Sequence, residues 1–229
     1  MSFDAGNRLI AALDAANRRD ADALVERLGG VPSWCKIGLE LFCAEGPGIV
    51  ADYVARGRRV MLDLKLHDIP ETVSRAASRV GSLGAGLLTV HAGGGKAMLE
   101  AAVVAAGDTR VLAVTVLTSL DDADLAQIGA QGPVRELVVL RAQLAIAAGC
   151  AGVVASPHEI APIRAIAPEG FLIVTPGVRP AGAAAGDQKR VMTPREARAA
   201  GADLVVVGRP LRDAADPAAA ARSIVAELR

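Results

Sequence analysis

The alternation of short apolar segments with longer helix-like segments constrains the fold of this chain more than any other feature. Strands that are apolar on both faces and alternate with helices are typical of a parallel sheet covered by helices. We expect strands at 8–14, 34–39, 61–66, 86–91, 111–116, 152–155, 172–175 and 204–207. We expect helices at 17–28, 47–56, 70–83, 94–106, within 121–148 with a break near 132–133, and at 158–166, 193–200 and 217–228. Eight such units in 229 residues predict an α/β fold, a closed (β/α)8 TIM barrel.

The domain organisation follows from the same pattern. No change of composition marks a linker, so we expect a single barrel domain over residues 1–229. A doubly wound open sheet is the competing fold. The absence of Gly-x-Gly-x-x-Gly after the first expected strand weakens that alternative.

Composition and charge exclude several classes of function. The formal net charge is +0 and aromatic residues make up 2% of the chain, so we do not expect nucleic-acid binding. No apolar run is long enough to span a bilayer, and the first residues lack the basic and apolar regions of a signal peptide. We therefore expect a cytoplasmic enzyme with no membrane contact. The 3 cysteines have no Cys-x-x-Cys spacing, which argues against a disulfide framework.

The stretch 61–70 combines a strand pattern with charges. Apolar and charged residues alternate, so Asp63 and Lys65 point to one face and three leucines to the other. Asp68 falls in the following loop, and Pro70 can open a helix. An edge strand with a solvated charged face is the alternative interpretation. Because the opposite face is leucine, we expect the charges to point into the barrel and form a site.

Polar residues recur where strands are expected to end, which is where (β/α)8 barrels carry their catalytic groups. They are Asp14, Lys36, Asp63, Lys65, Asp68, His91, Thr118 and Arg209. Lys36 lies in an apolar strand and needs a partner, which Asp63 could supply from the adjacent strand. Asp14 could instead cap the first helix. We expect His67 and His91 to be structural, and no spacing of ligand residues resembles a metal site.

The segment after the seventh expected strand is a long loop of small and polar residues. We interpret about 176–191 as a mobile active-site lid that carries Arg179 and Gln188. The eighth strand ends at Gly208 and Arg209, a place where barrels often bind phosphate. Glycine lets the backbone approach an anion, and arginine can pair with it bidentately. These residues predict a phosphate monoester as ligand.

Together these residues resemble the signature of the orotidine 5′-phosphate decarboxylase family. The strongest element is Asp-x-Lys-x-x-Asp at 63–68, combined with the lid and the final Gly-Arg pair. The supporting motifs, in the family's order, are Leu13-Asp14, Lys36-Ile37-Gly38, His91-Ala92, Val114 to Ser119, Thr175-Pro176-Gly177-Val178-Arg179 and Val207-Gly208-Arg209-Pro210. The resemblance covers essentially the whole chain. Glu71 departs from it, because bacterial relatives usually have Asn before Thr-Val.

The resemblance implies decarboxylation of orotidine 5′-phosphate to UMP and CO2, the last step of de novo UMP biosynthesis, with no metal and no organic cofactor. Lys65 would protonate C6 of the pyrimidine. It also implies a homodimer in which Asp68 and Thr72 reach the neighbouring site. The other implied roles are catalytic electrostatics for Lys36, Asp63 and Asp68, ribose binding for Asp14 and Lys36, pyrimidine recognition for Thr118, and phosphate binding for Arg179, Gln188, Gly208 and Arg209.

Three alternative functions remain open at this stage. A metal-dependent sugar-phosphate decarboxylase or synthase of the same superfamily shares the Asp-x-Lys-x-x-Asp element, but has an acidic metal ligand where this chain has Lys36. A Schiff-base aldolase needs a neutral lysine, whereas flanking Asp63 and Asp68 favour the charged form of Lys65. A non-catalytic phosphate-binding barrel would bury mixed charges at a cost in stability without a use for them.

Overall fold

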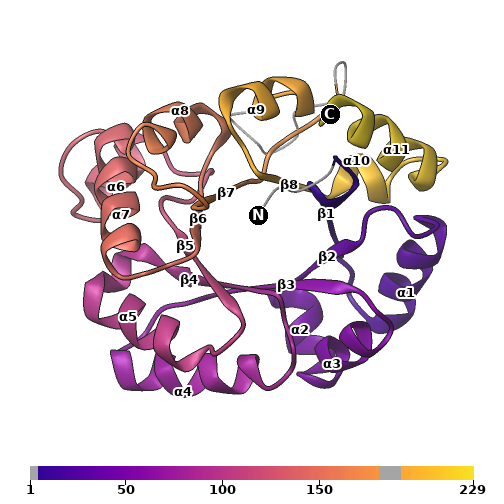
Figure 1. The fold of residues 1–229 in the computed structure, drawn as a ribbon, viewed down its shortest axis with the longest axis horizontal. Helices are drawn as coiled ribbons and strands as arrows, with labels where there is room; N and C mark the ends of the chain where they lie inside the picture. The colour runs from indigo at the N-terminus through magenta and orange to yellow at the C-terminus, as the bar shows by residue number, and fades with distance from the viewer. Residues whose placement is uncertain (1–4, 181–191) are drawn as a thin grey trace.

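The strands form a closed barrel in the computed structural model, which describes residues 5–180 and 192–229. All eight pairings are parallel, each strand pairs with the next, and β8 returns to β1 (Figure 1). The strands are β1 (Leu9–Ala12), β2 (Trp34–Gly38), β3 (Arg59–Leu66), β4 (Leu87–His91), β5 (Arg110–Val114), β6 (Gly152–Val154), β7 (Leu172–Thr175) and β8 (Leu204–Val207). The (β/α)8 barrel expected from the sequence is confirmed.

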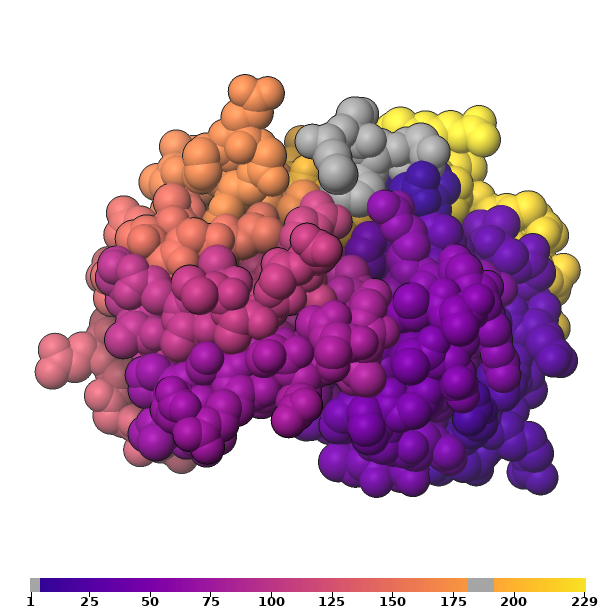
Figure 2. All heavy atoms as spheres, turned by 60° about the horizontal axis from the view of Figure 1, so that its bottom comes forward, coloured from indigo at the N-terminus to yellow at the C-terminus, as the bar shows by residue number. Residues whose placement is uncertain are grey.

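Helices form an outer ring around the strands (Figure 1). They are α1 (Arg18–Arg27), α2 (Leu39–Glu45), α3 (Gly48–Ala55), α4 (Pro70–Gly81), α5 (Gly95–Ala105), α6 (Asp122–Gln127), α7 (Val134–Ala147), α8 (Ile160–Arg164), α9 (Pro194–Ala200), α10 (Arg209–Arg212) and α11 (Pro217–Glu227). Short 3₁₀ turns lie at Ala5–Asn7, Ala92–Gly94 and Pro157–Glu159. Figure 2 shows one side of the molecule, where residues of the N-terminal half of the chain form most of the surface in front. None of the helices in the described part of the chain has both the length and the apolar character that a membrane span requires.

Two helices differ from the sequence-based prediction. The sequence predicts a strand that includes Leu39 and no helix between that strand and residue 47, yet residues 39–45 form α2 directly after β2. The turn α10, which begins at Arg209, was also not expected. Both are short, and each directly follows a strand. Too few residues repeat in such segments to produce a helical hydrophobic period.

The core has two layers, because side chains of a strand alternate between its two faces. Ten buried side chains fill the inside of the barrel: Ile10, Ala12, Trp34, Met61, Leu87, Leu112, Leu172, Val174, Leu204 and Val206. The larger layer lies between strands and helices, and it includes Leu62 and Leu88. The large Trp34 ring requires a glycine opposite, since a Cβ at Gly86 would lie 2.9 Å from it.

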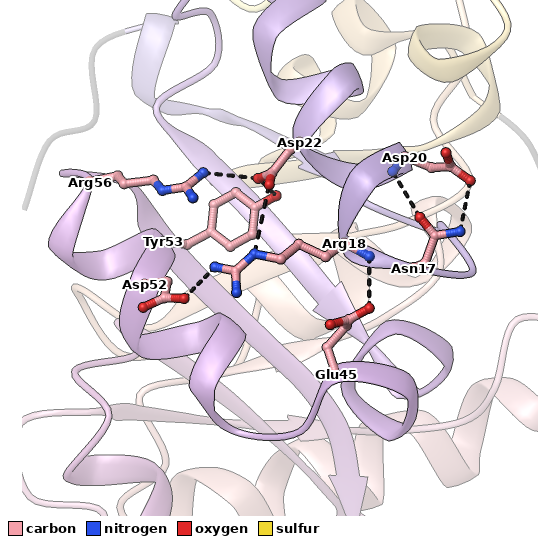
Figure 3. A network of polar contacts seen from close by, with 8 residues as sticks. All are labelled: Asn17, Arg18, Asp20, Asp22, Glu45, Asp52, Tyr53 and Arg56. Carbon is pink, nitrogen blue, oxygen red and sulfur yellow. Dashed lines mark hydrogen bonds and ion pairs between the residues drawn. The ribbon is translucent and has the colours of Figure 1, made fainter.

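Charged side chains on the outer surface tie α1 to α3 (Figure 3). The Tyr53 hydroxyl donates a hydrogen bond to Asp22 at 2.8 Å, and the Arg56 guanidinium pairs with the same carboxylate at 2.9 Å. Arg18 pairs with Asp52. Tyr53 is otherwise buried, so Asp22 supplies a partner for a hydroxyl that would be costly to leave unpaired.

Candidate active site

Two neighbouring cavities open where the strands of the barrel end. The first has a volume of about 150 Å³, and Asp14, Lys36, Gly177, Arg179, Gly208 and Arg209 are among its lining residues. The second has a volume of about 160 Å³ and is mainly apolar, with Lys36, Asp63, Lys65 and Thr118 beside Val116, Leu117 and Ala155. Lys36, Pro176 and Val206 line both cavities, which are therefore adjacent.

A row of alternating charges runs along the cavity walls. The Asp14 carboxylate lies 3.1 Å from the Lys36 ammonium, which lies 3.5 Å from Asp63. The other oxygen of Asp63 lies 2.9 Å from the Lys65 ammonium. The expected pairing of Lys36 with Asp63 is therefore present. Asp14 does not cap the first helix, because Asn17 occupies that position and accepts from the backbone N–H of Asp20.

Asp63 is the most buried member of this row, with 8% of its surface exposed. Burial opposes its charged form, but Lys36 and Lys65 and the hydrogen bonds from Lys65 and Thr89 outweigh that effect. The pKa of Asp63 is consequently lower than usual. The carboxylate is ionised at neutral pH and holds two cations close to one another.

The backbone of β3 is irregular at the charged residues. Leu62 pairs with Leu88 of β4, and the next pairing joins Leu66 to Val90. Residues 63–65 therefore lie opposite Thr89 alone, and Lys65 has a φ of 50°. The leucines still face the helices, as the alternation predicted, but a regular strand is wrong for this segment. Bulges of this kind re-aim side chains beside active sites.

Thr89 was not among the predicted site residues. It is fully buried, and its hydroxyl donates to the Asp63 carboxylate at 2.9 Å while accepting from the backbone N–H of Lys65 at 2.9 Å. The signal available in the sequence was a threonine at an inward position, between outward-facing Leu88 and Val90. Sequence reasoning could not connect it to β3, because that contact depends on the bulge.

The first cavity is lined by two arginines and by a backbone segment that packs closely against Asp14. Arg179 is 8% exposed, and Arg209 begins α10. A Cβ at Gly208 would lie 3.2 Å from the Asp14 carboxylate, so this position suits a residue without a side chain. Val178 forms a β-bridge with Met192, which joins the two ends of the segment expected to be a lid. Gln188 and most of that segment lie outside the described residues.

Asp68 and Thr72 are exposed, on the loop after β3 and on α4. The Asp68 carboxylate accepts a hydrogen bond from the backbone N–H of the next residue at 2.6 Å. The structure does not pair it with Lys65 within the chain. Ile69 beside it is 65% exposed. Glu71, the departure from the family's usual Asn, pairs with Arg75 at 2.8 Å on the surface of α4.

The two histidines near the site pack against each other. The His67 and His91 rings stack with centroids 5.3 Å apart and an interplanar angle of 19°. Burial, assisted by the positive charges of Arg141, His67 and Lys65, lowers the pKa of His91 to about 4. His91 is therefore neutral at physiological pH, which is compatible with the structural role expected for it.

Known proteins resemble the chain over almost its full length. A family model described as "Orotidine 5'-phosphate decarboxylase / HUMPS family" matches residues 7–224. The orotidine 5'-phosphate decarboxylase of Anaeromyxobacter sp. (strain K) is 57% identical over 222 residues, which cover 96% of this chain and 98% of that protein. The enzyme of that name from Thermobifida fusca (strain YX) is 51% identical over 218 residues, which cover 95% of this chain and 94% of that protein.

A solved structure agrees with these sequence relatives. The crystal structure of orotidine 5'-phosphate decarboxylase from Lactobacillus acidophilus superposes with a TM-score of 0.87 at 35% identity, covering 97% of this chain and 99% of that one. Fold, family model and relatives agree, and the chain belongs to the orotidine 5'-phosphate decarboxylase / HUMPS family.

Proposed function

We propose that this chain decarboxylates orotidine 5′-phosphate to UMP and CO2, with Lys65 as the group that protonates C6. The observation that carries the proposal is the alternating row of charges at Asp14, Lys36, Asp63 and Lys65. Curated relatives at 57% and 51% identity carry the name of this enzyme. The activity consumes a pyrimidine nucleotide precursor and belongs to pyrimidine biosynthesis.

The two cavities match the two ends of such a substrate. The phosphate occupies the arginine-rich first cavity, where Arg179, Arg209 and the backbone at Gly208 supply donors. Asp14 and Lys36 bind the ribose hydroxyls, because Lys36 lies at the boundary of both cavities. The pyrimidine ring enters the apolar second cavity, where Thr118 contacts its polar edge.

The charges beside the ring suit a reaction that forms a carbanion. The bond between C6 and the carboxylate carbon breaks, CO2 leaves, and the electron pair stays on C6. The Lys65 ammonium stabilises that charge and then transfers a proton to C6, after which solvent reprotonates the amine. Asp63 lies against the substrate carboxylate, so loss of CO2 relieves the repulsion between them.

One charge contact cannot account for the whole rate enhancement. Two unit charges about 4 Å apart interact by roughly 4 kcal/mol at an effective dielectric constant of about 20. Barrier reductions in enzymes reach about 20 kcal/mol. The remainder comes from preorganised electrostatics and from phosphate binding, which can drive closure of a lid over about 176–191 and exclude water.

The metal-dependent alternative is not favoured. Lys36, a cation, stands at the second-strand position where those relatives carry an acidic metal ligand. In the described part of the chain, no cluster of three or more His, Cys, Asp or Glu side chains is arranged to hold an ion. Each of the curated relatives described above is named as the orotidine enzyme.

A homodimer would complete the charge array with Asp68 and Thr72 from the neighbouring subunit. Both residues are exposed and lie next to the exposed Ile69, as an interface would require. Mixing Lys65→Ala with Asp68→Ala tests this arrangement. Hybrid dimers would contain one intact site each, so random exchange restores about one quarter of the sites. No regained activity after exchange, shown by mass spectrometry to be complete, would contradict shared sites.

The activity is tested by the loss of orotate absorbance when purified protein meets orotidine 5′-phosphate in a chelator. We expect full turnover in the chelator and none with Lys65→Ala. Arg195→Ala, on the exposed surface of α9, is the control and should behave as wild type. Undiminished turnover by Lys65→Ala would remove the proposed acid. If the wild-type protein were inactive in the chelator and regained turnover only when a divalent metal was added, the metal-dependent alternative would be favoured.

A further inference from the structure

The hydroxyl of Thr89 accepts a hydrogen bond from the backbone N–H of Lys65, a role that a backbone carbonyl would have in a regular strand. In a parallel ladder the N–H of Lys65 would donate to a carbonyl of the neighbouring strand. Here residues 63–65 bulge away from β4, and that N–H donates to Thr89 Oγ1 at 2.9 Å. The side chain of Thr89 thus supplies a hydrogen-bond partner for this N–H at the bulge.

The same hydroxyl also fixes the orientation of Asp63. Thr89 donates its proton to Asp63 Oδ1 at 2.9 Å, the oxygen that also lies 2.9 Å from the Lys65 ammonium. A hydroxyl can accept one hydrogen bond and donate another, so both contacts form at once. Thr89 is 0% exposed, and water therefore does not compete for either contact.

The backbone conformation of Lys65 requires such support. A φ of 50° is unfavourable for a residue with a side chain and persists where the surroundings hold it in place. In this conformation the Lys65 side chain returns to Asp63 and lines the second cavity. A regular strand at this position would leave neither the bulge nor the contact with Thr89.

We propose that Thr89 is a positioning residue for decarboxylation: its hydroxyl holds the strained Lys65 backbone and the Asp63 carboxylate in register, so that the ammonium meets C6. This inference rests on the proposed function of Lys65. Thr89 lines neither cavity, whereas Arg179 and Arg209, the proposed phosphate-binding residues, line the first. Its effect therefore falls on the chemical step and not on substrate affinity.

Thr89→Val tests the proposal, because valine keeps the shape and removes the hydroxyl. We expect kcat to fall about 100-fold, since a displacement of about 1 Å can cost that much. KM should stay within about threefold of wild type, because the phosphate contacts are intact. Thr89→Ser keeps the hydroxyl and should restore kcat to within about threefold of wild type.

A matched control lies at the opposite end of the barrel. Thr109 is also buried, and its hydroxyl donates to the carbonyl of Ala85 at 2.7 Å just before β5. Thr109→Val removes an equivalent hydrogen bond far from the site, so it should lower thermal stability and leave kcat unchanged. A fall in kcat for Thr89→Val that Thr109→Val does not share is thus not a general loss of stability.

The acid side of the pH profile gives a second readout. Asp63 is faced by Lys36 from β2, Lys65 from β3 and Thr89 from β4. Removing the Thr89 hydroxyl removes one contribution that holds the pKa of Asp63 down, so the acid limb of kcat/KM should move to higher pH. If Thr89 acted only through packing, Thr89→Val would leave the acid limb of kcat/KM unchanged.

Several outcomes would overturn the inference. They are a Thr89→Val enzyme with kcat within about threefold of wild type, or a Thr89→Ser enzyme as impaired as Thr89→Val. If Thr89→Val does not fold, the comparison of Thr89→Ser with Thr89→Ala repeats the test of the hydroxyl. An inactive Lys65→Ala beside an active Thr89→Val would contradict this inference alone, whereas a fully active Lys65→Ala would contradict the proposed function itself.

Discussion

Replacing Asp63 with asparagine should destabilise the fold, because it leaves two cations in a cavity without their shared partner. Asp63 lies 2.9 Å from the Lys65 ammonium and 3.5 Å from that of Lys36. At an effective dielectric constant of about 20 the two attractions are roughly 6 and 5 kcal/mol before desolvation is subtracted. Removing one partner of a buried pair typically costs about 3–5 kcal/mol.

That cost can be measured as a fall in the unfolding temperature. A domain of this size loses about 2–4 °C for each kcal/mol, so Asp63→Asn should lower Tm by about 6–20 °C. Asparagine has nearly the same shape and can still accept from Thr89, so the change isolates the charge. The control is Asp213→Asn, whose side chain is 58% exposed and pairs with Arg212 at the surface, and we expect no measurable change in Tm for it.

The Tm difference between wild type and Asp63→Asn should depend on pH in a direction that follows from the lowered pKa of Asp63. The pKa of Asp63 is lowered in the fold, so its stabilisation is complete above the value of the unfolded chain, about 3.9, and is lost as pH falls through the folded value. The gap in Tm between wild type and Asp63→Asn should be constant from about pH 5 to 8 and shrink below about pH 4. A gap of less than about 2 °C at neutral pH would refute the reasoning.

Three further results are expected. Arg209→Ala should lower kcat/KM by orders of magnitude with the fold intact in circular dichroism; an effect under about threefold would remove the phosphate assignment. NMR titration should show that His91 becomes protonated near pH 4, because burial lowers its pKa. A transition between about pH 6 and 7, the range of an unperturbed histidine, would contradict that effect of burial. Asp22→Ala should cost about 1–3 kcal/mol in denaturant unfolding, because the buried Tyr53 hydroxyl loses its partner, and should leave kcat unchanged; a cost under about 0.5 kcal/mol would mean that the network in Figure 3 contributes little.

The fold could be predicted because its signal is local and repeated. Apolar segments such as 172–175 and 204–207 have the observed strand boundaries, since each is short, β-branched and bounded by turn residues. Eight repeats of one unit leave few architectures open. The elements that were missed, α2 and α10, are single short helices whose start depends on where the preceding strand ends.

The site was predictable only as a set of residues. Position at the end of a barrel strand selected Asp14, Lys36, Asp63 and Lys65, because parallel strands bring those ends together. Thr89 was missed, since its inward position in a strand indicates burial but does not indicate contacts with Asp63 and Lys65. Asp68 and Thr72 are exposed and line neither of the two cavities, so their predicted role stays a prediction about a second subunit.

The sequence by itself determined the order of strands and helices, the faces of β3 and which charges stand at the mouth of the barrel, because these depend on residue type and on periods of two and of about 3.6 residues. The tertiary structure alone decided how those charges meet. The contact between Lys36 and Asp63 joins two strands, and the hydroxyl of Thr89 on a third strand hydrogen-bonds both Asp63 and the backbone of Lys65 at the bulge. Such contacts arise from the closure of the barrel, which no local pattern records.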